Sequence, residues 1–203
     1  RSPTNVAEWA DRIAISGVKK AQEVIAISAF TKQTIVDVLG YPAERITVIH
    51  RAVDQELFKP LDVPADFRAR YGLPAEAPLI LFLGSEDPRK NLATLLRAFH
   101  LVASRMPEAV LVKAGAVHFT QEAANLHGMV ARFGLQDHVF FLENLSDDDL
   151  PLLYNTADIV VMPSFFEGFG LPALEALTCG RPVIAANASS LPEVVGSAGM
   201  LFN

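Results

Sequence analysis

The sequence is poor in cysteine and tryptophan, with one residue of each, and it lacks a long uninterrupted apolar run. The single cysteine, Cys179, excludes an intramolecular disulfide and a zinc site built from several cysteines. No run of about 18 apolar residues is free of charge or proline, which argues against a membrane-spanning helix. A formal net charge of −6 argues against binding to nucleic acid, although a few local cations could still hold a small anionic ligand.

What the chain does have is an apolar fraction of 51% over 203 residues. This is enough for one core, or for one domain and part of another, and it is spread too evenly for a disordered chain. The sequence starts with Arg1 rather than methionine, shows no signal peptide and stops abruptly at Asn203. We therefore expect a piece of a longer protein.

Five apolar runs alternate with helical patterns from residue 79 onward. Runs that end in polar turns are typical of buried parallel strands, and here they lie at residues 79–83, 109–114, 138–142, 159–162 and 182–186. Amphipathic helices are predicted at residues 91–104, 121–133, 147–156 and 171–178. The alternation predicts a Rossmann-like, doubly wound α/β sheet, in which ligands bind beyond the carboxyl ends of the strands.

The first part of the chain has a shorter pattern of helix, strand, helix and strand. The helices are expected at about residues 6–21 and 29–39, and the strands at 24–27 and 46–49. Two strands make only a fragment of a sheet. A linker is expected at residues 51–64, where proline occurs and periodicity is weak. We therefore predict two domains, residues 1–58 and residues 59–203.

The strongest motif spans residues 163–176, where a predicted strand ends, a loop with two glycines follows and a helix begins. Gly168 and Gly170 permit close approach of the backbone, and the N–H groups at the start of a helix form an anion site. Glu167 precedes this site, and Glu175 lies about one turn into the helix. A nucleotide sugar presents groups in the same order: a hydroxyl-rich sugar for the first carboxylate, a diphosphate for the backbone amides, and a ribose diol for the second carboxylate. The alternative is a simple turn with two solvated glutamates.

A second motif lies at residues 84–91, after the first strand of this region. Arg89 and Lys90 are predicted at the start of the next helix, where cations oppose the helix dipole. The placement makes sense if a phosphate occupies the spot, held by arginine in bidentate fashion and by lysine as a point charge. The alternative is surface charge paired with Glu86 and Asp87.

Together these segments resemble the carboxyl-terminal half of a GT-B glycosyltransferase of family 4, the glycosyl transferases group 1. Glu167 and Glu175 reproduce the E-x7-E motif of that family, and residues 176–184 resemble its usual continuation. Residues 88–92 resemble its "RKNL" segment. Residues 24–58 resemble the stretch that crosses from the amino-terminal domain to the carboxyl-terminal one, so the resemblance implies a remnant of the amino-terminal acceptor domain before the donor domain.

The resemblance also implies roles for individual residues. As catalytic groups, Arg89 and Lys90 would neutralise the diphosphate and Glu167 would contact the donor sugar. Glu175 would accept hydrogen bonds from the ribose, and the loop at residues 142–145 would face the base. The donor-binding residues implied in this way are Gly84, Ser85, Asn144, Leu145, Gly168, Phe169, Gly170, Leu171 and Glu175.

The implied reaction is metal-independent transfer of a hexose, with retention, from a GDP- or UDP-linked sugar to a glycan or lipid-linked acceptor. The segment "EDPRKNL" resembles mannosyltransferase-like members and favours GDP-mannose as the donor. No cofactor is expected. The resemblance places the protein in the cytoplasm, with peripheral membrane association through the amino-terminal domain. We expect this fragment to bind donor but to show no detectable transfer. The alternatives are a hydrolase, epimerase or phosphorylase on the same fold, and a non-catalytic module that binds nucleotide sugars.

Two departures from the family pattern stand out. Ser85 occupies a position where most members have arginine, and we expect Arg89 to supply that charge. The common Asn-Gly-Val-Asp of the crossover reads Arg-Ala-Val-Asp at residues 51–54. This second departure concerns the hinge more than the donor site.

Other polar residues are expected to be structural. The acidic run at residues 146–149 resembles a metal-binding Asp-x-Asp, but it opens a predicted helix and is interpreted as a cap. The histidines have no metal-ligand spacing to one another, and they are His50, His100, His118, His127 and His138. His118 is the one placed to reach the cleft. Cys179 is interpreted as a buried small side chain.

Overall fold

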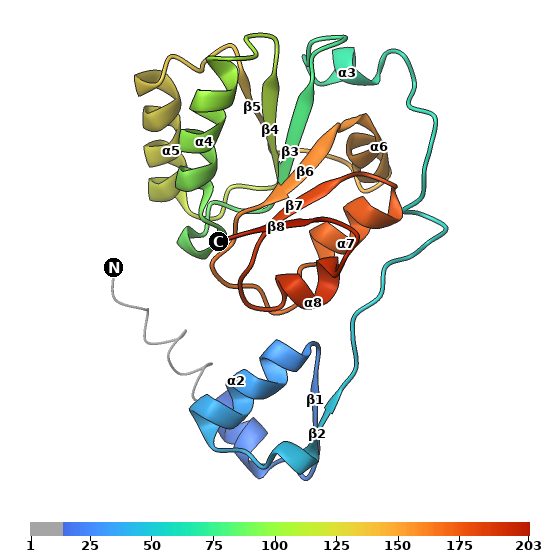
Figure 1. The fold of residues 1–203 in the computed structure, drawn as a ribbon, viewed down its shortest axis with the longest axis vertical. Helices are drawn as coiled ribbons and strands as arrows, with labels where there is room; N and C mark the ends of the chain where they lie inside the picture. Colours follow the sequence, from blue (N-terminus) through green and yellow to red (C-terminus); the bar gives the residue numbers. More distant parts are fainter. Residues whose placement is uncertain (1–13) are drawn as a thin grey trace. The chain divides into compact units, whose positions relative to one another are not determined.

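The computed structural model describes residues 14–203 and divides the chain into two compact units, Arg1–Arg51 and Ala52–Asn203 (Figure 1). The units are described separately. Of the helix expected at residues 6–21, the part before residue 14 lies outside the described residues, and residues 14–20 are helical.

The first unit contains one parallel pair of strands, as the sequence predicts. Strand β1 (Val24–Ala26) pairs with β2 (Ile46–Val48), and helix α2 (Ala29–Leu39) connects them through the 3-10 turn η1 (Ala43–Arg45). The hydroxyl of Ser28 caps α2 by accepting from the N–H of Thr31 at 2.9 Å. A small core holds this unit together, consisting of Ala26, Tyr41 and Ile46.

The second unit is built on a sheet of six parallel strands in the order β5-β4-β3-β6-β7-β8. The strands are β3 (Leu79–Leu83), β4 (Val110–Ala114), β5 (Val139–Leu142), β6 (Ile159–Met162), β7 (Val183–Ala186) and β8 (Met200–Phe202). The chain starts in the middle of the sheet, builds outward on one side, and then returns to build outward on the other. This is the doubly wound, Rossmann-like order, so the predicted fold class is confirmed.

Helices cover both faces of this sheet (Figure 1). Helices α4 (Leu92–Ala103) and α5 (Thr120–Arg132) lie on one face, and α6 (Asp149–Thr156), α7 (Leu171–Thr178) and α8 (Leu191–Val195) lie on the other. Alternate residues of β3 enter the two cores, because successive side chains of a strand point to opposite faces. Leu81 packs with the α6 and α7 side, whereas Phe82 packs with the α4 side.

Three short elements of the second unit were not expected from the sequence. They are α3 (Phe67–Arg70), α8 and β8, none longer than 5 residues. Segments of this length carry less than two turns of helical periodicity or less than two alternations of a strand, so their pattern is not distinct from that of a loop.

The segment that precedes α3 packs on the second unit. Phe58 is buried in its core, with its ring centroid 5.9 Å from that of Tyr154. The N–H of Leu61 donates to Asn155 Oδ1 at 3.0 Å, and Asn155 Nδ2 donates to the carbonyl of Lys59. The division between compact units therefore falls after Arg51, whereas the sequence analysis placed the boundary at residue 58.

The sheet order brings the two sequence motifs together. The chain leaves β3 towards β4 and leaves β6 towards β7, in opposite directions from two adjacent strands. A crevice forms at such a reversal beyond the carboxyl ends of the strands. The loop after β3 carries the Arg89 motif and the loop after β6 carries the Glu167 motif, so both motifs lie at this reversal.

Candidate functional site at the strand-order reversal

The loop after β3 places the two cations differently from the sequence expectation. Arg89 and Lys90 were expected at the start of the next helix, and they lie just before α4 in a separate 3-10 turn, η2 (Pro88–Lys90). Asp87 caps η2 by accepting from the N–H of Arg89 at 2.9 Å, and Asn91, with a φ of 56°, separates the turn from α4. Because Asn91 separates η2 from the first turn of α4, the conflict between these cations and the dipole of α4 is a weaker argument for a phosphate than the sequence suggested.

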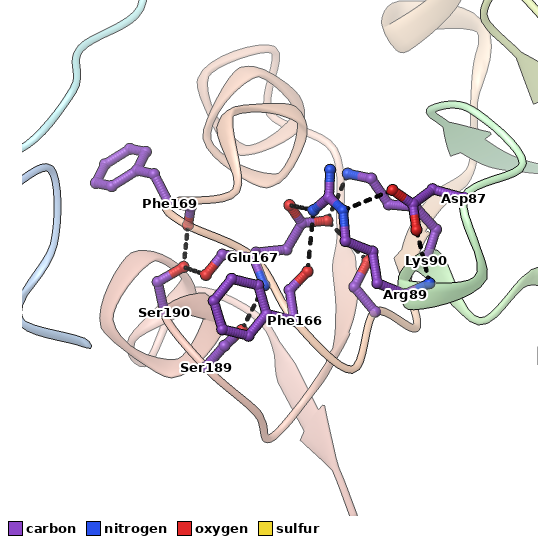
Figure 2. Close-up of polar contacts among 9 residues, drawn as sticks. Asp87, Arg89, Lys90, Phe166, Glu167, Phe169, Ser189 and Ser190 are labelled. Atoms are coloured by element: carbon purple, nitrogen blue, oxygen red, sulfur yellow. Dashed lines mark hydrogen bonds and ion pairs between the residues drawn. The ribbon is translucent and has the colours of Figure 1, made fainter. Parts of the chain in front are cut away.

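Instead, the cations converge on Glu167 (Figure 2). Lys90 Nζ donates to Glu167 Oε1 at 2.5 Å, and Arg89 Nη1 lies 3.4 Å from Glu167 Oε2. The hydroxyl of Ser164 also donates to Glu167 Oε1 at 2.8 Å. The side chains of Lys90 and Glu167 are only 11% and 7% exposed, whereas that of Arg89 is 44% exposed. The carboxylate is thus held by one buried and one half-exposed cation.

Arg89 ties the two loops together. Its Nε donates to Asp87 Oδ2 at 2.9 Å, and its Nη1 reaches the carbonyl of Phe166 at 3.2 Å. In return, the N–H of Phe165 donates to the carbonyl of Arg89 at 2.8 Å. Two cations and two carboxylates cancel formally in this cluster. An anionic ligand would therefore compete with Glu167 and Asp87 for the cations.

The loop after β7 fixes the backbone that carries Glu167 (Figure 2). Ser189 Oγ accepts from the N–H of Glu167 at 2.9 Å, and Ser190 Oγ lies 3.0 Å and 2.8 Å from the carbonyls of Glu167 and Phe169. Ser189 has a φ of 53°, a left-handed conformation that a non-glycine residue adopts only when its surroundings enforce it. The sequence analysis missed both serines, because a serine pair before Leu-Pro looks like an ordinary helix cap.

The start of α7 needs glycine at position 170. Gly170 has a φ of 100°, and a Cβ there would stand 2.9 Å from the side chain of Leu191. The prediction that this glycine allows an unusual backbone and close packing is confirmed. Helix α7 begins at Leu171. Pro172 has no N–H, and the N–H groups of Ala173 and Leu174 already donate to the carbonyl of Gly170 at 3.0 Å and 3.4 Å. Of these first helical positions, the N–H of Leu171 is the one that is available in principle to an anion.

Glu175 lies one turn into α7, as expected, and its carboxylate has a partner that the sequence did not reveal. Tyr154 of α6 donates its hydroxyl proton to Glu175 Oε2 at 2.7 Å. Tyr154 is fully buried. Burial, together with the nearby charge of Glu175, raises the pKa of the Tyr154 phenol well above its ordinary value, so the phenol remains a hydrogen-bond donor.

A second buried ion pair lies beside the site, and it too was missed. Lys113, at the end of β4, donates to Glu86, in the loop after β3. Lys113 Nζ also donates to the carbonyl of Gly115 at 2.6 Å, and Glu86 Oε2 accepts from the N–H of His118 at 3.2 Å. Burial raises the pKa of Glu86, but the hydrogen bonds from Lys113 and the backbone outweigh it and leave the pKa of this carboxyl below its ordinary value.

The other residues predicted to bind the donor lie at different distances from the cluster of Arg89, Lys90 and Glu167. Gly84 is adjacent, since a Cβ there would lie 3.7 Å from Lys90 Cε. Ser85 is partly buried between Gly84 and Glu86. Asn144 is exposed and Leu145 partly buried in the loop after β5. That loop lies two strands away from β3, and among the described residues no hydrogen bond or ion pair joins it to Glu167.

The features that the sequence analysis set aside behave as structural elements. Ser146 Oγ accepts from the N–H of Asp149 at 3.1 Å, which confirms the capping interpretation. The carboxylate of Asp149 binds Tyr71 and Arg70. Cys179 is buried, as expected. Within residues 14–203, no group of three or more His, Cys, Asp or Glu side chains is arranged to hold a metal ion, and no helix is long and apolar enough to cross a bilayer.

Comparison with known protein families decides the relationship. The family model described as "Glycosyl transferases group 1" matches residues 65–202, and that described as "Glycosyltransferase Family 4" matches residues 2–57. The chain belongs to the glycosyl transferases group 1 family. It is 33% identical over 204 residues to an O-antigen chain mannosyltransferase B of Escherichia coli, covering 98% of this chain and 52% of that protein. It is 37% identical over 192 residues to a D-inositol 3-phosphate glycosyltransferase of Streptomyces bingchenggensis, covering 91% of this chain and 42% of that protein.

This group 1 chain also resembles solved structures. HepE of Anabaena, solved in complex with UDP and glucose, aligns with a TM-score of 0.83 at 28% identity, over 95% of this chain and 52% of HepE. The GT-B fold expected from the sequence is thereby confirmed. The chain spans about half the length of the curated relatives it matches.

Proposed function

We propose that the second unit of this group 1 protein binds the nucleoside diphosphate of a sugar donor, and that the site serves transfer of the sugar to an acceptor. The observation that carries the proposal is the convergence of Lys90 and Arg89 on Glu167 at the strand-order reversal, directly before α7. The complex of HepE with UDP and glucose supports a nucleotide sugar as the ligand class.

In this proposal the diphosphate displaces the carboxylate of Glu167 from Lys90 and Arg89. Lys90 then acts as a point charge and Arg89 binds two phosphate oxygens, while the N–H groups at the start of α7 contribute further positive potential. When the bond between the anomeric carbon and the phosphate oxygen breaks, the electron pair goes to the diphosphate. The same cations stabilise that developing charge, with no metal ion required.

The residue released by this exchange is Glu167. Once the cations bind phosphate, its carboxylate is free to accept hydrogen bonds from sugar hydroxyls, while the hydroxyl of Ser164 still donates to one oxygen. Ser189 and Ser190 hold the backbone on either side, so the carboxylate does not move away with the loop. In this proposal the Glu167 carboxylate is the counterion of Lys90 and Arg89 before the donor binds, and a ligand of the sugar afterwards.

The finer identity of the reaction is also a proposal. The mannosyltransferase among the relatives favours a mannose donor and a glycan acceptor, and we propose GDP-mannose, with UDP-sugars as the competing donors. We propose transfer with retention of the anomeric configuration, because the group 1 pattern is that of retaining enzymes. A lipid-linked acceptor at the cytoplasmic membrane surface is part of the same proposal.

Calorimetric titration with GDP, UDP and ADP, and with their sugars, tests the binding step. We expect at least one nucleotide to bind below millimolar, and Lys90→Met to weaken it by about tenfold to a hundredfold, because a hydrogen-bonded charge is lost. Lys59→Met is the matched control, since Lys59 is half exposed and its ammonium pairs with Glu56 three residues away. Absence of binding, or equal affinity of wild type and Lys90→Met, would contradict the proposal.

A turnover assay separates the alternatives on the same fold. Release of free sugar from the donor in water alone would favour a hydrolase, and binding without any turnover in the full-length protein would favour a non-catalytic module. Sugar transfer by the full-length protein to a glycan, with none by residues 1–203 alone, is the result expected for a glycosyltransferase whose donor domain has been separated from most of its acceptor domain.

A further inference from the structure

Of the described residues that form the six-stranded sheet, Lys113 is the one that carries a charge. It stands in register between Phe82 of β3 and Phe141 of β5, and it is 1% exposed. An apolar side chain is the usual occupant of such a buried strand position, because taking an ammonium group out of water costs free energy. Lys113 therefore needs an explanation other than packing.

The counterion of Lys113 comes from the loop that carries the proposed phosphate-binding cations. Glu86 is 3% exposed and accepts from Lys113, while its other oxygen accepts from the N–H of His118 in the loop after β4. Lys113 Nζ also donates to the carbonyl of Gly115 at 2.6 Å. Because hydrogen bonds have a preferred direction, the pair joins the loops after β3 and β4 in one relative position.

The segment between β3 and η2 forms neither helix nor strand. At its start the N–H of Gly84 donates to the carbonyl of Ala114 at 2.9 Å, and at its end Asp87 caps η2. Glu86 lies directly before Asp87, so the buried ion pair fixes the chain at the point where η2 begins. A loop that is already ordered loses less conformational entropy when a ligand binds to it.

Asp87 passes this fixed position on to Arg89. Its two carboxylate oxygens accept from the N–H and from the Nε of Arg89, both at 2.9 Å. The guanidinium then lies with Nη1 3.4 Å from Glu167 Oε2. The Arg89 side chain is 44% exposed and would otherwise sample many rotamers, whereas binding two phosphate oxygens requires its planar group in one orientation.

We propose that Lys113 and Glu86 are positioning residues that hold Arg89, through Asp87, in the orientation in which it binds the diphosphate of the donor. The inference rests on the proposed donor-binding function. Lys113 and Glu86 do not touch the ligand, since the protein encloses both side chains. They order the loop in advance, so the diphosphate does not have to order it.

A purely structural role of the pair predicts a different result. Removing one partner of a buried ion pair leaves an unpaired charge, whereas removing both charges restores stability. If the pair only stabilises the fold, nucleotide affinity should fall in Lys113→Met and return, with the stability, in Lys113→Met combined with Glu86→Gln. If the pair positions Arg89, affinity should stay low in this double variant, because the bonds from the Lys113 ammonium are missing in both.

The experiment is calorimetric titration with GDP, or with UDP if that is the nucleotide that the wild type binds. We expect the double variant Lys113→Met with Glu86→Gln to bind about fivefold more weakly than the wild type, and Arg89→Met about tenfold more weakly. Adding the double variant to Arg89→Met should change the affinity by less than about twofold, because the pair acts through Arg89.

Leu135→Ala is the matched control for lost stability. Leu135 is buried before β5, at the opposite edge of the sheet from the loops that carry the site, and its truncation leaves a cavity. It should bind the nucleotide as the wild type does. Urea unfolding shows which variants are folded. If Lys113→Met does not fold, the double variant and Leu135→Ala still provide the comparison.

The outcomes are distinguishable. Wild-type affinity in the folded double variant, or a further loss of about fivefold when it is added to Arg89→Met, would overturn the positioning role and leave the proposed function standing. An equal loss of affinity in Leu135→Ala would also overturn it, since affinity would then follow stability alone. A wild type that binds no nucleotide would overturn both the positioning role and the proposed function.

Discussion

Two lysine–glutamate pairs lie at the carboxyl edge of the same sheet, and they differ in how completely the protein encloses them. Lys113 and Glu86 are each 1% exposed, and their remaining hydrogen bonds go to the backbone. Lys90 and Glu167 are slightly exposed, and their carboxylate is shared with Arg89 and Ser164. The same two residue types thus form a closed pair and an open one, and each pair takes one member from the loop after β3.

This difference in enclosure indicates which of the two ion pairs can respond to a ligand. A closed pair has no room for a competing anion, and breaking it leaves an unpaired charge in a medium that solvates it poorly. An open pair that shares its carboxylate can exchange one anion for another, because the cations keep a partner throughout. We therefore assign the Lys113–Glu86 pair to holding the loop after β3 in place, and the Lys90–Glu167 pair to binding.

The largest expected effect comes from breaking the closed pair. Lys113→Met should lower the free energy of unfolding by about 3–5 kcal/mol, because Glu86 is left buried without its counterion. Urea unfolding measures this, and the double variant Lys113→Met with Glu86→Gln should recover part of the loss. A loss no larger than that of the exposed Lys59→Met would show that the pair is not closed in solution.

A smaller effect of opposite sign is expected at the open pair. Glu167→Gln removes the carboxylate that competes for Lys90 and Arg89, so the affinity for a nucleoside diphosphate without sugar should rise about fivefold, or about 1 kcal/mol. The added affinity contributed by the sugar should fall in the same variant. Calorimetry with the nucleotide and its sugar derivative reads both changes. Weaker binding of the free nucleotide would mean that Glu167 does not compete for these cations.

The smallest effect concerns acid stability. The pKa of Glu86 is held below its ordinary value in the folded protein, so unfolding takes up a proton as the pH falls through the ordinary carboxyl range. The stability that this group contributes is therefore present above the unfolded pKa and is lost as the pH falls through the folded pKa. Urea unfolding at pH 7 and pH 3.5 should show a greater loss for the wild type than for Glu86→Gln. Equal losses would contradict the depressed pKa.

The long elements and the motif residues could be predicted from the sequence. The strands β3 to β7 and helices α4 to α7 have apolar patterns that depend only on local spacing, and each was predicted close to its observed bounds. Gly170 and the pattern of residues 163–176 carry their meaning within one short segment. The strand β8 and the turn η2 were not predicted, because their residues carry no pattern that is distinct from that of the adjoining loops.

The partners of the charged and hydroxyl groups could not be predicted. Ser190 directly precedes α8, yet its hydroxyl donates to the loop after β6. Tyr154 lies buried on α6, yet its hydroxyl donates to Glu175, 21 residues further along. In both cases the partner was chosen by the packing of another element, which no local pattern records.

The sequence by itself determined the alternation of strand and helix, the two loops at which a ligand would bind, and the family to which the chain belongs, since each of these is written in short contiguous patterns. Only the tertiary structure decided which charges pair. Lys113 and Glu86 are 27 residues apart, and Lys90 and Glu167 are 77 apart. The strand order places β3 between β4 and β6, so Glu86 and Lys90 on the loop after β3 meet Lys113 on one side and Glu167 on the other. That arrangement made one ion pair closed and left the other open.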